Sequence, residues 1–175
     1  MLRAGYPAFM SVRIVVPRPS DAEAIAEVHI RAWKDTYDHL LPAGFFTTEW
    51  QEGRRQLWRV ILGTENPHRS VRVAVSETPG EERRIVGFAL AGRPQDAKAP
   101  RGLLLYSLYV LAEHHGAGVG QGLLEAVLGD RPAFLWVERT NARARAFYER
   151  NGFDVDGVEQ VEEQFPGIVE VRMVR

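Results

Sequence analysis

Three glycines alternate with other residues in one short run, and this spacing is suited to binding a phosphate group. Gly116, Gly118 and Gly120 stand between an apolar, β-favouring segment at 103–110 and an apolar helical stripe at 118–128. The first backbone N–H groups of a helix have no partner within the helix, and they lie at the positive end of its dipole. The run therefore predicts an anion site where a strand turns into a helix. A plain strand-to-helix turn is the alternative interpretation.

Two common phosphate-binding loops do not fit this run. The dinucleotide fingerprint requires a third glycine three residues beyond the second, and those places hold Gln121 and Leu123. The P-loop requires Gly-Lys-Ser/Thr, and no lysine lies near the turn. The run at 115–122 therefore belongs to neither of these two classes of loop.

A second segment, at 134–153, joins an apolar strand to a helix with two polar side chains of chemical interest. Asn141 is a good helix N-cap, and Gly152 stands where a helix would end. Asn141 and Tyr148 are separated by about two helical turns, so their side chains face the same side. Taken alone, Tyr148 is compatible with a core aromatic residue whose hydroxyl reaches the surface.

Together the two segments resemble the GNAT superfamily of N-acetyltransferases. The run from His115 to Gly120, His-Gly-Ala-Gly-Val-Gly, is similar to the family's acyl-CoA pyrophosphate loop, with His115 in place of the usual Gln or Arg. The segment at 134–153 is similar to the family's closing strand, Asn-capped helix, catalytic Tyr and Gly-Phe turn. The two motifs span about 103–153, and the flanking elements fit the same fold.

The resemblance implies an acetyl-CoA-dependent N-acetyltransferase that moves the acetyl group directly to a primary amine through a tetrahedral intermediate. It implies that the glycine turn holds the pyrophosphate of acetyl-CoA and that Asn141 bonds the pantetheine arm. The expected catalytic groups are the Tyr148 hydroxyl, which protonates the departing sulfur, and the Val110 N–H, which stabilises the oxyanion. The expected cofactor-binding residues are Leu108, Tyr109, Val110, Gly116, Ala117, Gly118, Val119, Gly120, Gln121, Asn141 and Tyr148.

The general base is the role that the resemblance does not assign. Many relatives have a Glu near the start of the strand, but no carboxylate occurs at 103–110. Relatives of the ribosomal-protein type often place a Glu five residues before the Asn, and this chain has Trp136 there. Glu138 remains a candidate. His114 and His115 lie beside the predicted phosphate site, and we expect both to be surface side chains.

The acceptor is expected to bind between the first two helices and the loop at 92–101. At pH 7 a lysine amine costs about 4–5 kcal/mol to neutralise and an α-amine about 1 kcal/mol, which favours an acceptor other than a protein lysine. We expect a small-molecule amine, with a peptide or protein N-terminal α-amine as the alternative. The aromatic residues at this end are also compatible with simple packing of helices onto the sheet. The expected substrate-binding residues are Trp33, Tyr37, Asp38, Trp136 and Glu138.

Two other classes of protein stay open. A non-catalytic acyl-CoA sensor would keep the glycine turn without transferring a group, and the missing carboxylate supports it. Tyr148 argues against a sensor, because a sensor has no leaving group to protonate. A phosphate-binding or protein-interaction module that does not use coenzyme A is the remaining class.

Composition limits the partners. The chain has 175 residues, a formal net charge of −1 and no cysteine. The charge gives no electrostatic case for nucleic acid or an anionic membrane, and the lack of cysteine excludes disulfides and thiolate metal sites. No metal site is expected. No apolar run approaches the ~20 residues that span a bilayer, so we expect a cytoplasmic monomer or homodimer. Residues 1–10 are expected to be a disordered leader, and 11–175 a single N-acetyltransferase domain.

The pattern of apolar residues predicts an α+β fold with the element order β-α-α-β-β-β-α-β-α-β-β. A capping box at Ser20–Glu23 is expected to open the first helix, and a second one at Thr48–Gln51 to open the next. The resemblance implies a mixed, mostly antiparallel central sheet flanked by helices. It also implies that the strand with Tyr109 and the strand with Trp136 splay apart to admit the pantetheine arm.

Overall fold

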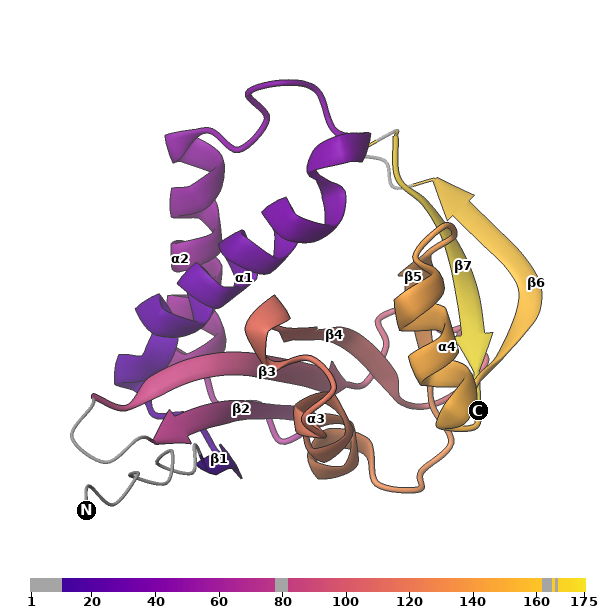
Figure 1. The fold of residues 1–175 in the computed structure, drawn as a ribbon. Coiled ribbons are helices and arrows are strands. Elements are labelled where there is room, and N and C mark those ends of the chain that lie inside the picture. Colours follow the sequence, from indigo (N-terminus) through magenta and orange to yellow (C-terminus); the bar gives the residue numbers. More distant parts are fainter. Residues whose placement is uncertain (1–10, 78–81, 162–164, 166) are drawn as a thin grey trace, which may run out of the picture.

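The fold is built on one seven-stranded sheet (Figure 1). The structure is a computed structural model that describes residues 11–77, 82–161, 165 and 167–175, so the expected leader at 1–10 lies outside the described residues. All neighbouring strands are antiparallel except β4 and β5, which are parallel. In sheet order the strands are β1 (Ser11–Val15), β2 (Arg69–Glu77), β3 (Arg84–Gly92), β4 (Leu104–Val110), β5 (Phe134–Glu138), β7 (Val169–Val174) and β6 (Asp154–Val161).

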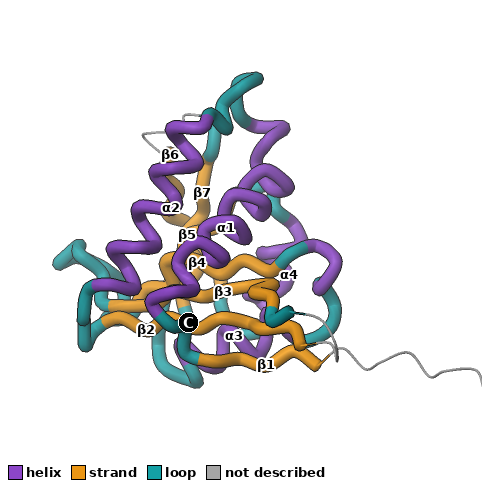
Figure 2. Tube along the Cα trace, turned by 90° about the vertical axis from the view of Figure 1, so that its left-hand side faces the viewer, coloured by secondary structure: helices purple, strands orange, loops and turns teal. Residues whose placement is uncertain are grey.

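Helices cover both faces of this sheet. Neighbouring residues of β2 face opposite sides: Val73 packs with the α1 and α2 cluster, whereas Ala74 packs with the α3 and α4 cluster. Figure 2 shows α1 and α2 on one side of β1–β4 and α3 on the other. The predicted α+β class and element order are confirmed. Within the described residues no helix is both long and apolar enough to cross a membrane. The helices are α1 (Ala22–Tyr37), α2 (Thr48–Gly63), α3 (Val119–Leu128) and α4 (Ala142–Arg150).

The sheet opens between β4 and β5. These two strands pair only at Leu104 with Phe134 and at Leu105 with Leu135. Beyond that point β4 continues along β3, while β5 continues along β7, so the two halves of the sheet diverge (Figure 1). The predicted splay of the strands that contain Tyr109 and Trp136 is therefore confirmed.

The beginnings of the first two helices differ from the predictions. No capping box forms at Ser20, because a short 3-10 turn at Pro19–Asp21 precedes α1. The Asp21 carboxylate instead accepts the Arg18 N–H (2.8 Å) and pairs with Arg83 (2.7 Å), which draws it away from the helix. At α2 the cap is one residue earlier than predicted: the Thr47 hydroxyl accepts the Trp50 N–H (3.1 Å).

A glycine permits the close approach of β3 to β4 beside the opening. A Cβ on Gly87 would lie 2.9 Å from the Tyr109 carbonyl oxygen and 3.2 Å from a Leu123 side-chain carbon. We therefore expect Gly87→Ala to lower the free energy of unfolding by about 1–3 kcal/mol, as measured by urea denaturation. The matched control is Gly53→Ala, in the interior of α2 with nothing within 4 Å, which should raise that free energy by up to about 1 kcal/mol. Equal effects of the two changes would contradict the close contact.

Candidate active site

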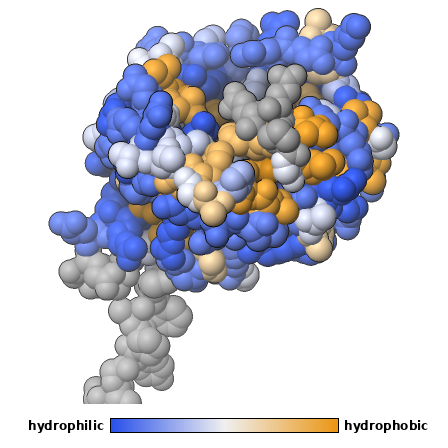
Figure 3. All heavy atoms as spheres, turned by 90° about the horizontal axis from the view of Figure 1, so that it is seen from above, coloured by the Kyte–Doolittle hydropathy of each residue, from blue (hydrophilic) through white to orange (hydrophobic). Residues whose placement is uncertain are grey.

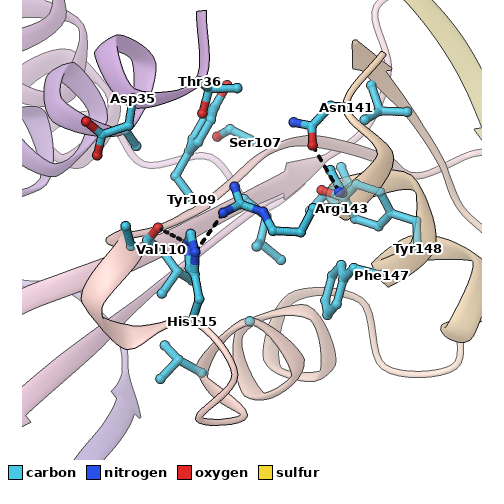
Figure 4. A pocket seen from close by; sticks show the side chains of 18 of the residues that line it. Asp35, Thr36, Ser107, Tyr109, Val110, His115, Asn141, Arg143, Phe147 and Tyr148 are labelled. Carbon is cyan, nitrogen blue, oxygen red and sulfur yellow. Dashed lines mark hydrogen bonds between the residues drawn. The ribbon is translucent and has the colours of Figure 1, made fainter. Parts of the chain in front are cut away.

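A cavity of about 540 Å³ lies where β4 and β5 separate (Figure 4). Its wall includes every expected cofactor-binding residue except Ala117, which is exposed in the glycine turn. Of the expected substrate-binding residues, Tyr37 and Trp136 line the cavity, whereas Trp33, Asp38 and Glu138 do not. The structure thus brings the glycine turn, the β4 edge and the α4 tyrosine into one space.

The glycine turn presents the amino end of α3 to this cavity. Gly116 and Gly118 both have φ of +78°, a left-handed conformation that favours glycine. Gly118 is the N-cap of α3, and its carbonyl accepts the Gly122 N–H (3.0 Å). The N–H groups at 119–121 precede that first helical bond, so helix geometry leaves them without an intrahelical acceptor. The turn can therefore hold an anion through its backbone.

The β4 edge offers peptide groups to the same cavity. The Leu111 N–H points toward β3, because it donates to the Val86 carbonyl (2.9 Å). Peptide N–H groups alternate in direction along a strand, so those of Val110 and Leu108 point the other way. On that side the pairing with β5 has already ended at Leu105. Two strand N–H groups thus face the opening.

His115 joins the end of β4 to the start of α4. Its Nδ1 accepts from Arg143 (2.7 Å) and its Nε2 donates to the Val110 carbonyl (2.8 Å), as Figure 4 shows. An arginine only donates and a carbonyl only accepts, so in this arrangement Nδ1 is the acceptor and Nε2 the donor. Sequence reasoning missed Arg143, whose guanidinium lies in the cavity close to the glycine turn. The expectation for His114 is wrong: its side chain is buried.

Asn141 and Tyr148 both line the cavity from α4 (Figure 4). The Asn141 Oδ1 accepts the Ala144 N–H (3.0 Å), so the predicted cap is confirmed and the side-chain NH₂ is not used by the cap. Tyr148 is 8% exposed and packs between Phe147 and Phe153. Burial raises the pKa of Tyr148 above its ordinary value, so its hydroxyl keeps its proton at neutral pH.

Tyrosine hydroxyls also meet at the other end of the cavity. The Tyr37 hydroxyl lies 3.4 Å from that of Tyr109. Burial raises the pKa of Tyr37 to about 12, and the negative charge of Glu170 adds to this effect. Burial likewise raises the pKa of Tyr109 well above its usual value. Both hydroxyls are therefore protonated, and one of them donates to the other, which leaves one O–H and the oxygen lone pairs for further hydrogen bonds.

The remaining expected substrate-binding residues, Trp33, Asp38 and Glu138, lie outside the cavity wall. Trp33 packs against Tyr37 and Trp50, with ring centroids 4.8 and 5.5 Å away. Asp38 is exposed in a 3-10 turn after α1. The Glu138 carboxylate is buried and accepts the Thr140 N–H (2.9 and 3.0 Å) and hydroxyl (2.8 Å). These bonds use the Glu138 oxygens to close the turn between β5 and α4.

Sequence reasoning also missed Glu170, which lines the cavity from β7. The signal for Glu170 is its register: it stands opposite Glu138 in the antiparallel β5–β7 pair. Cross-strand partners share a face of the sheet, so a residue opposite a suspected site residue is itself a candidate. The pairing of Glu170 with Glu138 is set by β5 and β7, two strands that are distant in sequence.

Comparisons with known proteins agree with this geometry. The profile of the acetyltransferase (GNAT) domain matches residues 67–155. The probable N-acetyltransferase Rv2775 of Mycobacterium tuberculosis is 25% identical over 84% of this chain and 82% of its own. The 5-NmdU N-acetyltransferase of Pseudomonas phage PaMx11 is 33% identical over 57% of this chain and 69% of its own. The chain therefore belongs to the GNAT family of acetyltransferases, and it is an acyltransferase.

Solved structures agree on the fold. The PaiA N-acetyltransferase of Thermoplasma acidophilum, solved in complex with coenzyme A, superposes with a TM-score of 0.61 at 22% identity. That match covers 95% of this chain and 100% of the other. The fold is therefore shared across nearly the full length of both chains.

A buried histidine supports the ring of Tyr109. His29 stacks on that ring with centroids 5.5 Å apart, and its Nδ1 accepts from the Trp58 indole N–H (3.1 Å). Burial, with a smaller contribution from the Arg54 charge, lowers the pKa of His29 to about 3. The ring is therefore neutral in the folded protein at any pH at which the protein is assayed.

This histidine predicts a loss of stability in acid. Unfolded histidine has a pKa of about 6.5, so below that pH the unfolded chain takes up a proton that the folded chain does not bind. The contribution of His29 is complete above about pH 6.5 and decreases by up to about 1.4 kcal/mol per pH unit below it. We expect the difference in unfolding free energy between wild type and His29→Gln, from urea denaturation at several pH values, to have this slope. A difference independent of pH would contradict a neutral buried His29.

Proposed function

We propose that this protein is an acetyl-CoA-dependent N-acetyltransferase that transfers the acetyl group directly to the primary amine of a small molecule. The observation that supports it most directly is the shared cavity: the glycine turn, the unpaired N–H of Val110 and the Tyr148 hydroxyl all face it. Each of these groups has a distinct task in acyl transfer from a thioester. The family also contains a structure solved with coenzyme A.

The residues of the cavity fit acetyl-CoA. Amides at 119–121 suit the pyrophosphate, and the Arg143 guanidinium, which contacts His115 beside the turn, supplies positive charge. The outward peptide groups of Leu108 and Val110 suit the amide-rich pantetheine arm as an added strand. The free NH₂ of Asn141 is a further donor on the opposite wall. When bound, acetyl-CoA supplies the activated acetyl group.

The proposed transfer uses two groups of this chain. The Val110 N–H stabilises the negative charge that develops on the carbonyl oxygen as the amine nitrogen attacks. As the C–S bond breaks, Tyr148 donates its proton to the sulfur. A thiolate has a lower proton affinity than a phenolate, so this proton transfer depends on close positioning of the Tyr148 hydroxyl. The proton lost from the new amide nitrogen restores Tyr148.

Contacts at the acceptor end favour a small acceptor. The connection between α1 and α2 touches the connection between β6 and β7: a Cβ on Gly167 would lie 2.5 Å from the Leu40 carbonyl oxygen. Phe165 packs on Trp33 and Phe45, with both ring centroids 5.2 Å away. This end presents an apolar patch within a hydrophilic surface (Figure 3). Because these two connections are in contact, we expect this end to suit a small amine better than a protein chain.

The Tyr148→Phe change tests the proposed acid. The substitution keeps the ring in its packed position and removes only the hydroxyl. We expect kcat for acetyl-CoA-dependent acetylation of an amine to decrease by about 10²-fold or more, with acetyl-CoA affinity unchanged. Thiol release and calorimetric titration measure the two quantities. An equal loss in both would make Tyr148 a structural residue.

The glycine turn is tested by a matched pair of variants. Gly118 and Gly44 share a φ of +78°, and neither has an atom within 4 Å of its would-be Cβ. Valine at either position should therefore cost a similar amount of stability, about 1–3 kcal/mol. Only Gly118→Val should weaken acetyl-CoA binding, by about tenfold or more, because only this side chain would crowd the diphosphate. Calorimetry measures binding, and unimpaired binding by Gly118→Val would exclude the turn as the phosphate site.

A further inference from the structure

β7 presents one carboxylate to the cavity at its acceptor end. Val171 and Met173 of this strand belong to the core shared with α3 and α4. Side chains alternate along a strand, so Glu170 and Arg172 face the opposite side, toward α1. Arg172 lies over the Trp136 ring, with 5.8 Å to the centroid, and Trp136 also lines the cavity. Glu170 is therefore on the face of the sheet where an acceptor would enter.

The surroundings of Glu170 combine one negative charge with two hydroxyl groups. Tyr37 and Tyr109 line the same cavity, with their oxygens 3.4 Å apart. The negative charge of Glu170 reaches both, since beyond the effect of burial it contributes to the raised pKa of each. The Gln160 side-chain amide donates to Glu170 Oε2 (2.8 Å) from the neighbouring strand β6. The carboxylate thus has a defined position beside the tyrosine pair.

The other carboxylates of the site are less suited to receive a proton from an amine. Among the described residues, Asp35 and Glu170 are the acidic side chains that line the cavity, and Asp35 is exposed on α1. Glu138 is committed to Thr140 and does not line the cavity. Strand β4 contains no carboxylate at all. Glu170 is half-buried, lines the cavity and has a carboxylate that can receive the proton.

We propose that Glu170, with the hydroxyls of Tyr37 and Tyr109, binds the ammonium group of a small primary amine and accepts its proton before acetyl transfer. This inference rests on the proposed function and extends it to the acceptor. The ammonium gives one proton to the carboxylate, which releases it to solvent. The neutral nitrogen then bonds to the carbonyl carbon, the C–S bond breaks, and the sulfur takes the Tyr148 proton. The second proton leaving the nitrogen restores Tyr148.

A subsite of this kind selects for a cation beside aromatic walls. A carboxylate attracts an ammonium, and the aromatic rings of Tyr37 and Tyr109, which line the same cavity, can contribute cation–π attraction. A neutral analogue of the same shape offers the carboxylate no opposite charge, so its binding should be weaker. The expected acceptors are therefore small amines that are protonated in solution, such as benzylamine, and not the corresponding alcohols.

The test compares Glu170→Gln with wild type, using benzylamine, tyramine, putrescine and glycinamide as acceptors. At about pH 7 we expect kcat/KM for the amine to decrease by about 10²-fold, with acetyl-CoA affinity unchanged. Near pH 10, where benzylamine and glycinamide are largely neutral in solution, the loss for these two acceptors should shrink to less than about tenfold. A loss that is the same at every pH, or no loss, would overturn the assignment. The matched control is Glu159→Gln on β6, an exposed residue paired with Arg139, which should behave as wild type.

Two additional measurements make each outcome decisive. Glu170→Asp keeps the charge and should retain more activity than Glu170→Gln. The aspartate variant also provides a test if the glutamine variant does not fold. Calorimetry on the protein saturated with coenzyme A should show binding of benzylamine but not of benzyl alcohol, and Glu170→Gln should abolish it. If wild type binds amines in this way but releases no thiol, the proposed transfer fails and the subsite stands. If it neither binds nor acetylates them, both fail.

Discussion

The candidate active site depends on the short pairing between β4 and β5. Two residue pairs join the halves of the sheet, at Leu104 and Leu105, and from there each strand follows a different neighbour. Unpaired strand N–H groups normally cost free energy when they are withdrawn from water, about 1–3 kcal/mol each. Here the groups of Leu108 and Val110 face a cavity large enough for a ligand. The short pairing that opens the sheet also leaves these N–H groups available for the proposed thioester substrate.

Packing on both sides of the opening keeps it in place. Tyr148 belongs to the core formed by α3, α4 and both halves of the sheet, so the proposed acid is held by the same contacts that stabilise the fold. The ring of Tyr109 is held by His29, which Trp58 keeps as a neutral acceptor. Across the cavity, Arg143 and His115 connect α4 to the end of β4. Side chains from five separate segments therefore define the shape of a single site.

The two ends of the cavity differ in electrostatic character, which gives the proposed reaction a direction. The glycine turn and Arg143 provide positive potential suited to the diphosphate of acetyl-CoA. At the far end, Glu170 and protonated tyrosines suit a cation. Between them stand the Val110 N–H and the Tyr148 hydroxyl. An anionic donor and a cationic acceptor would thus meet at the β4 edge from opposite sides.

The amino-acid sequence alone determined the features that depend on neighbours along the chain. The glycine turn, the Asn141 cap, the stop of α3 at Gly129 and the element order follow from hydrogen bonds and periodicities within a few residues. Only the tertiary structure decided which side chains meet in the cavity. Arg143 meets His115 from 28 residues away, and Glu170 enters the site through its pairing with β5. The local rules failed at Ser20 for the same reason: a 3-10 turn at Pro19–Asp21 precedes α1, and its Asp21 carboxylate is held by Arg83 from the region of β3. Such contacts depend on strand register and helix packing, which no short stretch of sequence encodes.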